Sequence, residues 1–234
     1  MKFKCIGTGS SGNCYLIELG GSYILLDAGV TIEKITKAIN LNLVDFAFIS
    51  HEHKDHSLSE ENLRYRAVSI LEGRIIHKFE KITKFSQNKA KLDLYCFPVE
   101  HGDCPTSGII IHKSGNVKGE EPETILYVTD FNNCVYDLSD FKFTSVIVEC
   151  NYIKDKTINA DNFTRTKENI YRHLSLEGCD MFLSKLDLSN CKEIILTHFS
   201  ENFSDPIFMG SYINHKYKIK TLCCRKFGGY DIYE

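Results

Sequence analysis

The stretch His51-Glu-His-Lys-Asp-His56 carries three imidazoles and a carboxylate within six residues. It directly follows the apolar run Phe46-Ala-Phe-Ile-Ser50, which predicts a buried strand, so the six residues form the loop at that strand's carboxyl end. Alternate residues of an extended loop point to the same side. The first two histidines are therefore expected to bind one metal ion, and a turn after the lysine aims the aspartate and the last histidine at a second. The alternative is a solvated turn, but three of nine histidines within six positions favour a metal site.

The length and composition are those of a globular protein. With 234 residues, 43% of them hydrophobic and 25% charged, the chain is long enough to bury a core, and we expect a single domain over residues 1–234. The formal net charge of −3 provides no global basic field. A nucleic-acid partner would therefore have to be held by local patches or by bound metal.

The cysteines and the N-terminal sequence predict a cytoplasmic protein. The ten cysteines are mostly scattered singly in apolar runs without a C-x-x-C pair, which is typical of reduced thiols acting as small core residues. The N-terminal Met1-Lys-Phe-Lys-Cys-Ile6 lacks the apolar region of a signal peptide. No apolar run approaches the ~20 residues that cross a bilayer, so we expect no membrane partner.

Apolar runs separated by turn signals predict the other elements. Strands are expected at 2–6, 13–19, 23–27, 94–100, 108–113, 124–129, 144–149, 193–197 and 220–224, the last closing a sheet edge. Helices are expected after Thr31, over 164–172 and 176–187, and from Ser204-Asp-Pro206. Strands followed by helices occur twice, in 1–93 and in 94–234, which predicts two packed halves.

Two glycine-containing segments indicate turns. Gly20-Gly21 between two apolar runs predicts a two-residue β-hairpin. Gly7-Thr-Gly-Ser-Ser-Gly-Asn13 is followed by a strand rather than a helix, so it is a tight turn and not a dinucleotide-binding loop.

Further residues able to bind metal stand where apolar runs stop. His101, Asp130, Glu149 and His198 each end or follow a predicted strand. Adjacent strand ends lie about 4.8 Å apart, so these side chains are expected to converge with the histidine-rich loop at one sheet edge. Asp130 is the natural bridging ligand, because a carboxylate can span two cations about 3.5–4 Å apart.

The order His-x-His-x-Asp-His, His, Asp, His resembles the metallo-β-lactamase superfamily over essentially the whole chain. The resemblance implies an α/β fold, an αββα sandwich of two mixed sheets flanked by helices, with metals at one sheet edge. Four segments resemble the YycJ/WalJ branch of DNA-processing hydrolases, which includes exonucleases: Gly7–Cys14, Leu26–Gly29, Glu149–Asn151 and His173–Ser175. Thr197-His-Phe-Ser200 is similar to the tRNase Z branch.

The resemblance implies a role for each matching residue. The first metal is expected on His51, His53 and His101, and the second on Asp55, His56 and His198, with Asp130 shared. Two divalent ions are implied, zinc by preference and manganese as the alternative. Asp27 braces the metal loop, and Glu149 with His173 delivers a proton to the leaving oxygen; Asp55 counts among the catalytic residues as well.

The chain departs from these patterns near the proton donor. The WalJ-type pattern continues Glu-Ala-Asn-His-Asp, whereas here Asn151 is followed by Tyr152 and Ile153. Arg172 stands in place of the glycine before His-Leu-Ser. The tRNA-clamping arm of tRNase Z has no counterpart. A histidine at position 53, where diiron oxygen-reducing members have glutamate, argues against that activity.

Three functions are compatible with these residues. The favoured one is a dinuclear metal-dependent phosphodiesterase that hydrolyses nucleic acid, DNA over RNA, as an exonuclease using a metal-bridging hydroxide. The second is the same chemistry on a small substrate such as a cyclic nucleotide, and the third is a non-catalytic metal-holding protein that binds nucleic acid or a protein. Basic side chains available for backbone phosphates are Lys78, Lys81, Lys84, Lys89, Lys91, Lys216, Lys218, Lys220, Arg225 and Lys226.

Overall fold

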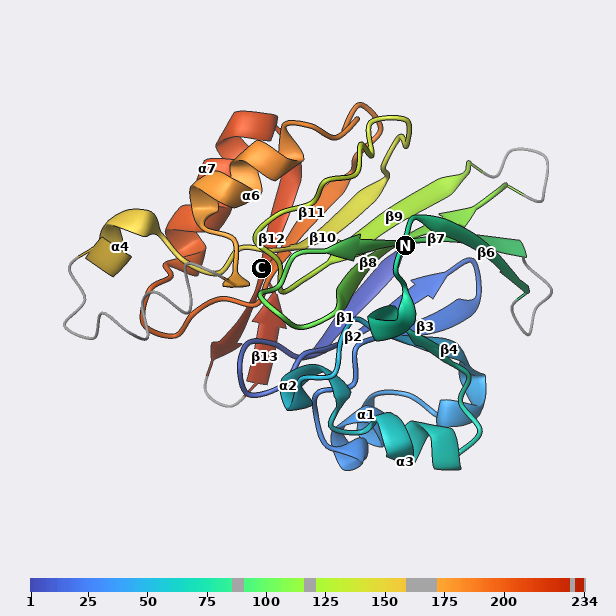
Figure 1. Ribbon diagram of the computed structural model, residues 1–234. Helices are drawn as coiled ribbons and strands as arrows, with labels where there is room; N and C mark the ends of the chain where they lie inside the picture. The colour runs from blue at the N-terminus through green and yellow to red at the C-terminus, as the bar shows by residue number, and fades with distance from the viewer. Residues whose placement is uncertain (86–90, 116–120, 159–171, 228–229, 234) are drawn as a thin grey trace.

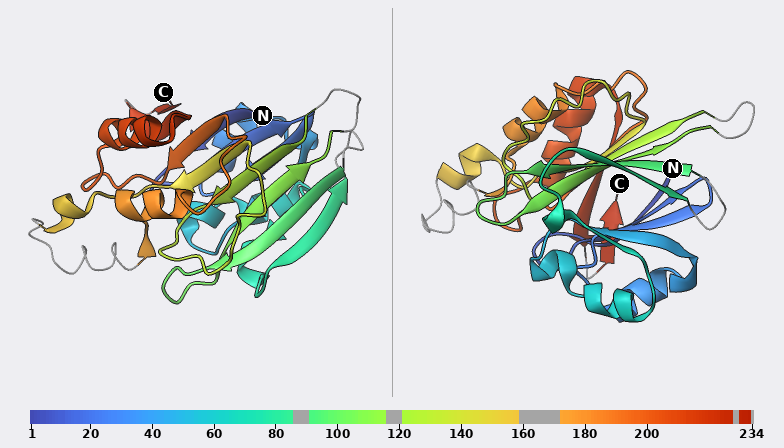
Figure 2. Two further views of the ribbon diagram at one scale, coloured as in Figure 1. Left: turned by 90° about the horizontal axis from the view of Figure 1, so that it is seen from above. Right: turned by 45° about the vertical axis from the view of Figure 1, so that its right-hand side comes forward.

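Two mixed β-sheets pack face to face, and helices cover the outer face of each (Figures 1 and 2). The computed structural model describes residues 1–85, 91–115, 121–158, 172–227 and 230–233. This four-layer αββα arrangement confirms the predicted fold class.

The first sheet is built from the N-terminal part of the chain and has the strand order β1-β2-β3-β4-β5. Its strands are β1 (Lys2–Gly7), β2 (Cys14–Leu19), β3 (Ser22–Leu26), β4 (Val44–Ile49) and β5 (Ile70–Glu72). Gly20 and Gly21 connect β2 to β3 with φ angles of 56° and 82°, the left-handed conformation that glycine adopts without steric cost. The predicted hairpin is therefore confirmed.

Short helices cover the outer face of the first sheet. On this face lie α1 (Ile32–Ala38) and α3 (Glu60–Tyr65). The other short helices of this part of the chain are η1 (Leu41–Leu43), α2 (Lys54–Ser57) and η2 (Gly73–Ile75), and η2 contacts both β4 and β8. Thr31 stands at the N-cap of α1 as expected, although its side chain makes no capping hydrogen bond. The apolar side chains of α1 and α3 pack on this face, where Ile35 and Leu63 are fully buried.

The second sheet has the strand order β13-β12-β11-β10-β9-β8-β7-β6. Its strands are β6 (Glu80–Phe85), β7 (Lys91–Val99), β8 (Thr106–Lys113), β9 (Glu123–Val128), β10 (Ser145–Glu149), β11 (Glu193–Thr197), β12 (Lys220–Phe227) and β13 (Tyr230–Tyr233). Strands β9 to β12 run parallel. Two expectations are corrected: β13 pairs beyond β12 at the edge, and the second sheet begins with β6 rather than after residue 93.

The outer face of the second sheet is covered by α6 (Leu176–Leu183) and α7 (Pro206–Tyr217), with α4 (Lys154–Ile158) beside them. Ser175 caps α6 by accepting a hydrogen bond from Gly178 N at 3.1 Å, and Asp205 caps α7 in the same way. Helix α6 ends four residues earlier than the predicted 187. The helix predicted over 164–172 lies outside the described residues except for its last position.

The main core lies between the two sheets. Tyr15 and Phe48 of the first sheet meet Tyr127 and Ile147 of the second, all with almost no exposed surface. All ten cysteines lie in the described part of the chain, and none forms a disulfide. Among the described helices, none is both long enough and apolar enough to span a membrane.

Candidate metal centre

Strands of both sheets deliver the predicted site residues to one edge. In the second sheet, the parallel neighbours β9, β10 and β11 end at or just before Asp130, Glu149 and His198. Strand β7 runs in the same direction and ends just before His101. The histidine-rich loop 51–56 follows β4 of the first sheet. The predicted convergence is therefore observed.

Three site residues have a left-handed backbone although none is glycine. The φ angles are 58° at Asp27, 49° at Asp130 and 55° at His198, each directly after a strand or one residue later. Such conformations cost about 1–3 kcal/mol each and persist only where surrounding contacts hold them. The strand ends are thus bent away from regular geometry where the site side chains are presented.

A first cluster contains His51, His53, His101 and Asp130, whose potential ligand atoms all lie within 4.8 Å of one another. His53 Nδ1 lies 2.9 Å from His51 Nε2 and 3.4 Å from His101 Nε2. Nδ1 of His101 faces the main-chain oxygen of Arg172 at 2.9 Å, so a proton there leaves Nε2 available as a ligand.

A second cluster contains Asp55, His56, Asp130 and His198, again within 4.8 Å. His56 Nε2 and His198 Nε2 lie 3.3 and 3.4 Å from Asp130 Oδ1. The other oxygen of this carboxylate, Oδ2, lies 3.6 Å from His101 Nε2 in the first cluster. Asp130 therefore turns one oxygen to each cluster, which is the geometry a bridging ligand requires.

The loop 51–56, which contributes residues to both clusters, contains the turn expected after Lys54. His53 is the N-cap of α2, so Asp55 and His56 lie in a single helical turn. This turn, not an extended chain, separates them from the first two histidines. Gly29 packs against it so closely that an ideal Cβ at Gly29 would lie 1.7 Å from Asp55 O.

The donor set fits two divalent cations. Nε2 of His198 is buried and makes no hydrogen bond within the described residues, although two carboxylates lie 3.4 and 3.7 Å from it. A buried polar atom without a partner is costly, and a metal ion coordinated there would satisfy it. Imidazole with a few carboxylates is a ligand set that zinc and manganese accept.

Electrostatics at the second cluster favour a cation. Burial disfavours charge on His56, but Asp130 and Asp27 outweigh it and raise the pKa of His56 well above its usual range. At His198, burial likewise opposes charge, and Asp130, Asp55 and Glu149 raise its pKa to about 10. In the first cluster, burial and the neighbouring His56 lower the pKa of His51 well below normal.

Asp27 orients histidines of both clusters. Its Oδ2 accepts hydrogen bonds at 2.6 Å from His56 Nδ1 and at 3.0 Å from Ser50 Oγ, and its Oδ1 accepts one from Ser50 N at 2.7 Å. Ser50 Oγ also lies 3.0 Å from His51 Nδ1. The resemblance implies that Asp27 braces the metal loop. In the structure, Asp27 contacts His56 directly and is linked to His51 through Ser50.

The glycine-rich loop supports the second cluster. Asn13 donates from its main-chain N to Asp55 O at 2.7 Å, and its amide Nδ2 lies 2.9 Å from His56 Nε2. Thr8 Oγ1 accepts a hydrogen bond from His198 N at 3.2 Å. The residues of this loop predict only a turn, because nothing local indicates that it packs beneath ligands from two distant segments.

The predicted Glu149–His173 pair adjoins the second cluster. His173 Nδ1 lies 2.5 Å from Glu149 Oε1, and the same oxygen lies 3.3 Å from His198 Nδ1. The rings of His173 and His198 stack with centroids 5.0 Å apart. Burial opposes ionisation of Glu149, but His173 and His198 outweigh it and lower its pKa.

Several of the expected phosphate-binding lysines are already paired with acids. Lys81 and Lys91 lie 2.9 and 3.4 Å from Asp93, and Lys216 lies 2.5 Å from Asp180. Lys89 lies outside the described residues. These pairs favour a structural or solvated role for the three lysines.

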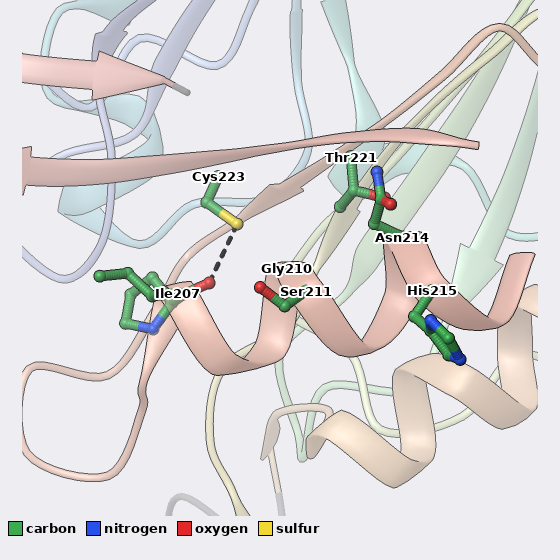
Figure 3. A pocket seen from close by; sticks show the side chains of 8 residues that line it. Ile207, Gly210, Ser211, Asn214, His215, Thr221 and Cys223 are labelled. Atoms are coloured by element: carbon green, nitrogen blue, oxygen red, sulfur yellow. Dashed lines mark hydrogen bonds between the residues drawn. The ribbon is translucent and has the colours of Figure 1, made fainter. Parts of the chain in front are cut away.

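A separate pocket of about 490 Å³ lies between α7 and β12 (Figure 3). Cys223 Sγ donates to Pro206 O at 3.2 Å within it. Its lining residues are Pro206, Ile207, Gly210, Ser211, Asn214, His215, Thr221 and Cys223. None of them belongs to either cluster, so this pocket is not part of the metal centre.

Part of the sequence is similar to known proteins. Residues 7–67 match the model of the metallo-β-lactamase superfamily. A 60-residue segment is 37% identical to exodeoxyribonuclease WalJ of Streptococcus pneumoniae, covering 24% of this chain. The match spans only 22% of the length of that relative.

Solved structures resemble the whole chain at low sequence identity. The metallo-β-lactamase fold protein YhfI of Bacillus subtilis superposes with a TM-score of 0.69 at 14% identity, covering 99% of this chain and 98% of YhfI. The short form of human tRNase Z superposes with a TM-score of 0.60 at 15% identity, covering 97% of each chain. Together, these matches show that the chain has the metallo-β-lactamase fold and that its residues 7–67 are similar to the metallo-β-lactamase superfamily.

Proposed function

We propose that this protein is a dinuclear metal-dependent phosphodiesterase that hydrolyses nucleic acid, DNA in preference to RNA, as an exonuclease. Its metal ligands would be the seven residues of the two clusters: His51, His53, Asp55, His56, His101, Asp130 and His198. Two divalent ions held there would acidify a water molecule and polarise a phosphoryl oxygen. The similarity of one segment to an exodeoxyribonuclease supports DNA as the substrate.

The observation that carries the proposal is the Glu149–His173 pair. Glu149 is fully buried and holds Nδ1 of His173, whose side chain keeps 14% of its surface exposed. With Nδ1 protonated and bound to the carboxylate, Nε2 is the ring atom left to give a proton to a leaving oxygen. A phosphodiester needs such an acid, because its alkoxide leaving group is strongly basic. A protein that only stored or bound metal would not need one.

Arg172 supports a substrate with more than one phosphate. Its main chain is bound to His101, and its side chain passes Gly102, where an ideal Cβ would lie 3.6 Å from Arg172 Nε. This side chain is exposed and forms no ion pair with the described residues. Guanidinium groups bind phosphate through parallel N–H donors. Arg172 is therefore positioned to contact a phosphate next to the one being cleaved.

The test is hydrolysis by purified protein with Mn²⁺ or Zn²⁺ of linear DNA, circular single-stranded DNA, RNA and cyclic nucleotides. We expect mononucleotides from linear DNA, slower hydrolysis of RNA and no cleavage of the circle. Asp130→Ala, prepared identically, controls for contaminating nucleases. Cleavage of the circle would contradict an exonuclease.

A second candidate is hydrolysis of a small cyclic nucleotide, which the net charge of −3 and the acid-paired lysines favour. Turnover of cyclic nucleotides alone in the same panel would select it. Binding of two metals without any turnover would instead indicate a non-catalytic binder.

A further inference from the structure

Tyr127 of the second sheet reaches Asp27, which follows β3 of the first sheet and braces the metal centre. It lies in β9 of the second sheet, three residues before Asp130, and has no exposed surface. Its ring packs edge-on against two aromatic rings of the first sheet, with centroids 6.0 Å from Tyr15 and 6.3 Å from Phe48. The ring is therefore part of the core, and its hydroxyl extends beyond that core.

The hydroxyl of Tyr127 donates to Asp27 Oδ2 at 2.5 Å. Burial and the nearby Asp27 carboxylate raise the pKa of Tyr127 well above its usual value, so the phenol keeps its proton and remains a donor. The same carboxylate oxygen accepts from His56 Nδ1 at 2.6 Å. The hydroxyl and the histidine thus fix Asp27 from two sides.

Asp27 is also connected to the first cluster. Ser50 Oγ donates to Asp27 Oδ2 and lies 3.0 Å from His51 Nδ1. With both Nδ1 atoms protonated and bound in this network, His51 and His56 present Nε2 toward Asp130, at 3.9 and 3.3 Å. Hydrogen bonds of this kind select the histidine tautomer and hold the ring in its ligating orientation.

We infer that Tyr127 is a positioning residue of the metal centre, whose hydroxyl holds Asp27 and, through it, the ligand histidines of both clusters. This inference rests on the proposed dinuclear site. Without the hydroxyl, a buried carboxylate loses one of its donors and can move away from His56. The effect falls mainly on the second metal, because His56 contacts Asp27 directly whereas His51 does so through Ser50.

The test compares metal-free wild type, Tyr127→Phe and Tyr217→Phe. Phenylalanine retains the ring packing and removes only the hydroxyl. Tyr217 is the matched control, because its hydroxyl also donates to a carboxylate, that of Asp180 at 2.8 Å, outside the metal centre. Zinc affinities are measured by competition with a chromophoric chelator, Co²⁺ coordination by visible absorption, and stability by thermal unfolding with and without zinc.

We expect Tyr127→Phe to bind the second zinc about tenfold more weakly, at the low end of the range for outer-shell variants. Its Co²⁺ spectrum should change, and its thermal stabilisation by zinc should shrink, while Tyr217→Phe matches wild type in all three. Unchanged affinity and spectra in Tyr127→Phe would overturn the inference. Unfolding of this variant without metal would do so too, since the hydroxyl would then serve the fold. Fewer than two zinc ions in wild type would instead overturn the proposed function on which the inference rests.

Discussion

At the scale of single residues, Asp130 and His173 are close in space but are expected to do different work. Asp130 contributes an oxygen to each cluster, whereas His173 touches Glu149 and lies 4.0 Å from the nearest Asp130 oxygen. Loss of the first should therefore disturb metal binding, and loss of the second should disturb proton transfer.

We predict that His173→Ala retains two metals and loses about 10²–10⁴-fold in turnover of a dinucleotide, the usual cost of removing a general acid. The loss should be much smaller with bis-(p-nitrophenyl) phosphate, whose leaving group needs no proton. Asp130→Ala should lose both metal and turnover. The measurements are the metal content of each variant by atomic emission, and its kcat on the dinucleotide and on bis-(p-nitrophenyl) phosphate. Equal losses of kcat on both esters for His173→Ala would show that the histidine is not the acid.

The raised pKa values of His56 and His198 predict that metal binding releases protons. In the metal-free protein the pKa of His198 is about 10 and that of His56 is also raised. Both rings are therefore in the charged imidazolium form at pH 7.5. A metal needs the neutral ring, and about two protons should therefore leave when the second site fills. Calorimetry in two buffers of different ionisation enthalpy counts them. Release of none would contradict the assignment of these histidines as ligands.

The raised pKa values of His56 and His198 also predict how the stability of the metal-free protein depends on pH. A pKa raised on folding stabilises the folded state fully below the unfolded value of 6.5, and this contribution is lost as the pH rises toward 10. The metal-free protein should thus lose stability between these values. Zinc affinity should change in the opposite direction, because proton competition weakens as the pH rises.

At the scale of elements, the close approach of one loop to another holds the second cluster. Gly29 follows β3 and lies against α2, where a side chain would collide with main-chain atoms of Asp55 and His56, at 1.7 and 2.7 Å from an ideal Cβ. Main-chain atoms cannot rotate away as a flexible side chain can. The absence of a side chain at Gly29 is therefore a requirement of this helix position.

We predict that Gly29→Ala displaces α2 and weakens binding of the second metal by at least about tenfold. Gly178→Ala is the matched control, because the atom nearest to the added Cβ in α6 would be the side-chain Cδ2 of Leu174 at 3.1 Å, with Ser175 Oγ at 3.6 Å, and no main-chain atom is among its nearest neighbours. That variant should stay within about 1 kcal/mol of wild-type stability, with helix propensity compensating the contact. Zinc titration and thermal unfolding of both variants provide the measurement. Normal metal affinity in Gly29→Ala would show that α2 tolerates the shift.

At the scale of the whole molecule, charge decides how a polynucleotide could bind. The chain carries a net charge of −3, and Lys81, Lys91 and Lys216 are paired with acids. The first cluster instead has an exposed guanidinium beside it, that of Arg172. Contacts with substrate phosphates should thus be few and local.

We predict that Arg172→Gln raises KM for a DNA oligonucleotide and makes its dependence on log salt about 0.7–0.9 units less steep, the change for one phosphate contact. Hydrolysis of bis-(p-nitrophenyl) phosphate, which has no neighbouring phosphate, should be unchanged. Arg66→Gln removes an equal charge at the end of α3 and is the control. An identical salt dependence in Arg172→Gln and wild type would exclude the contact.

The sequence by itself determined the fold class and indicated which side chains converge at one sheet edge. His51, His53 and His56 occupy one short loop, and Asp130 and His198 each follow an apolar strand, so local periodicity was sufficient to find them. Neighbouring strand ends in a sheet necessarily share an edge, which is why residues far apart in the chain could be assigned to one site. Parallel pairing of β9, β10 and β11 made this geometric rule apply here.

The tertiary structure alone decided how those side chains are held and shared. The packing of the two sheets decides which oxygen of Asp130 faces which cluster. It also brings the hydroxyl of Tyr127 to Asp27, a residue 100 positions away in the sequence. The support of His56 by Asn13 and the additional edge strand β13 depend on it as well. Such contacts join segments whose local patterns show only a strand or a turn. They form because the sheets bury their apolar faces against each other, a condition of the whole chain that no short stretch contains.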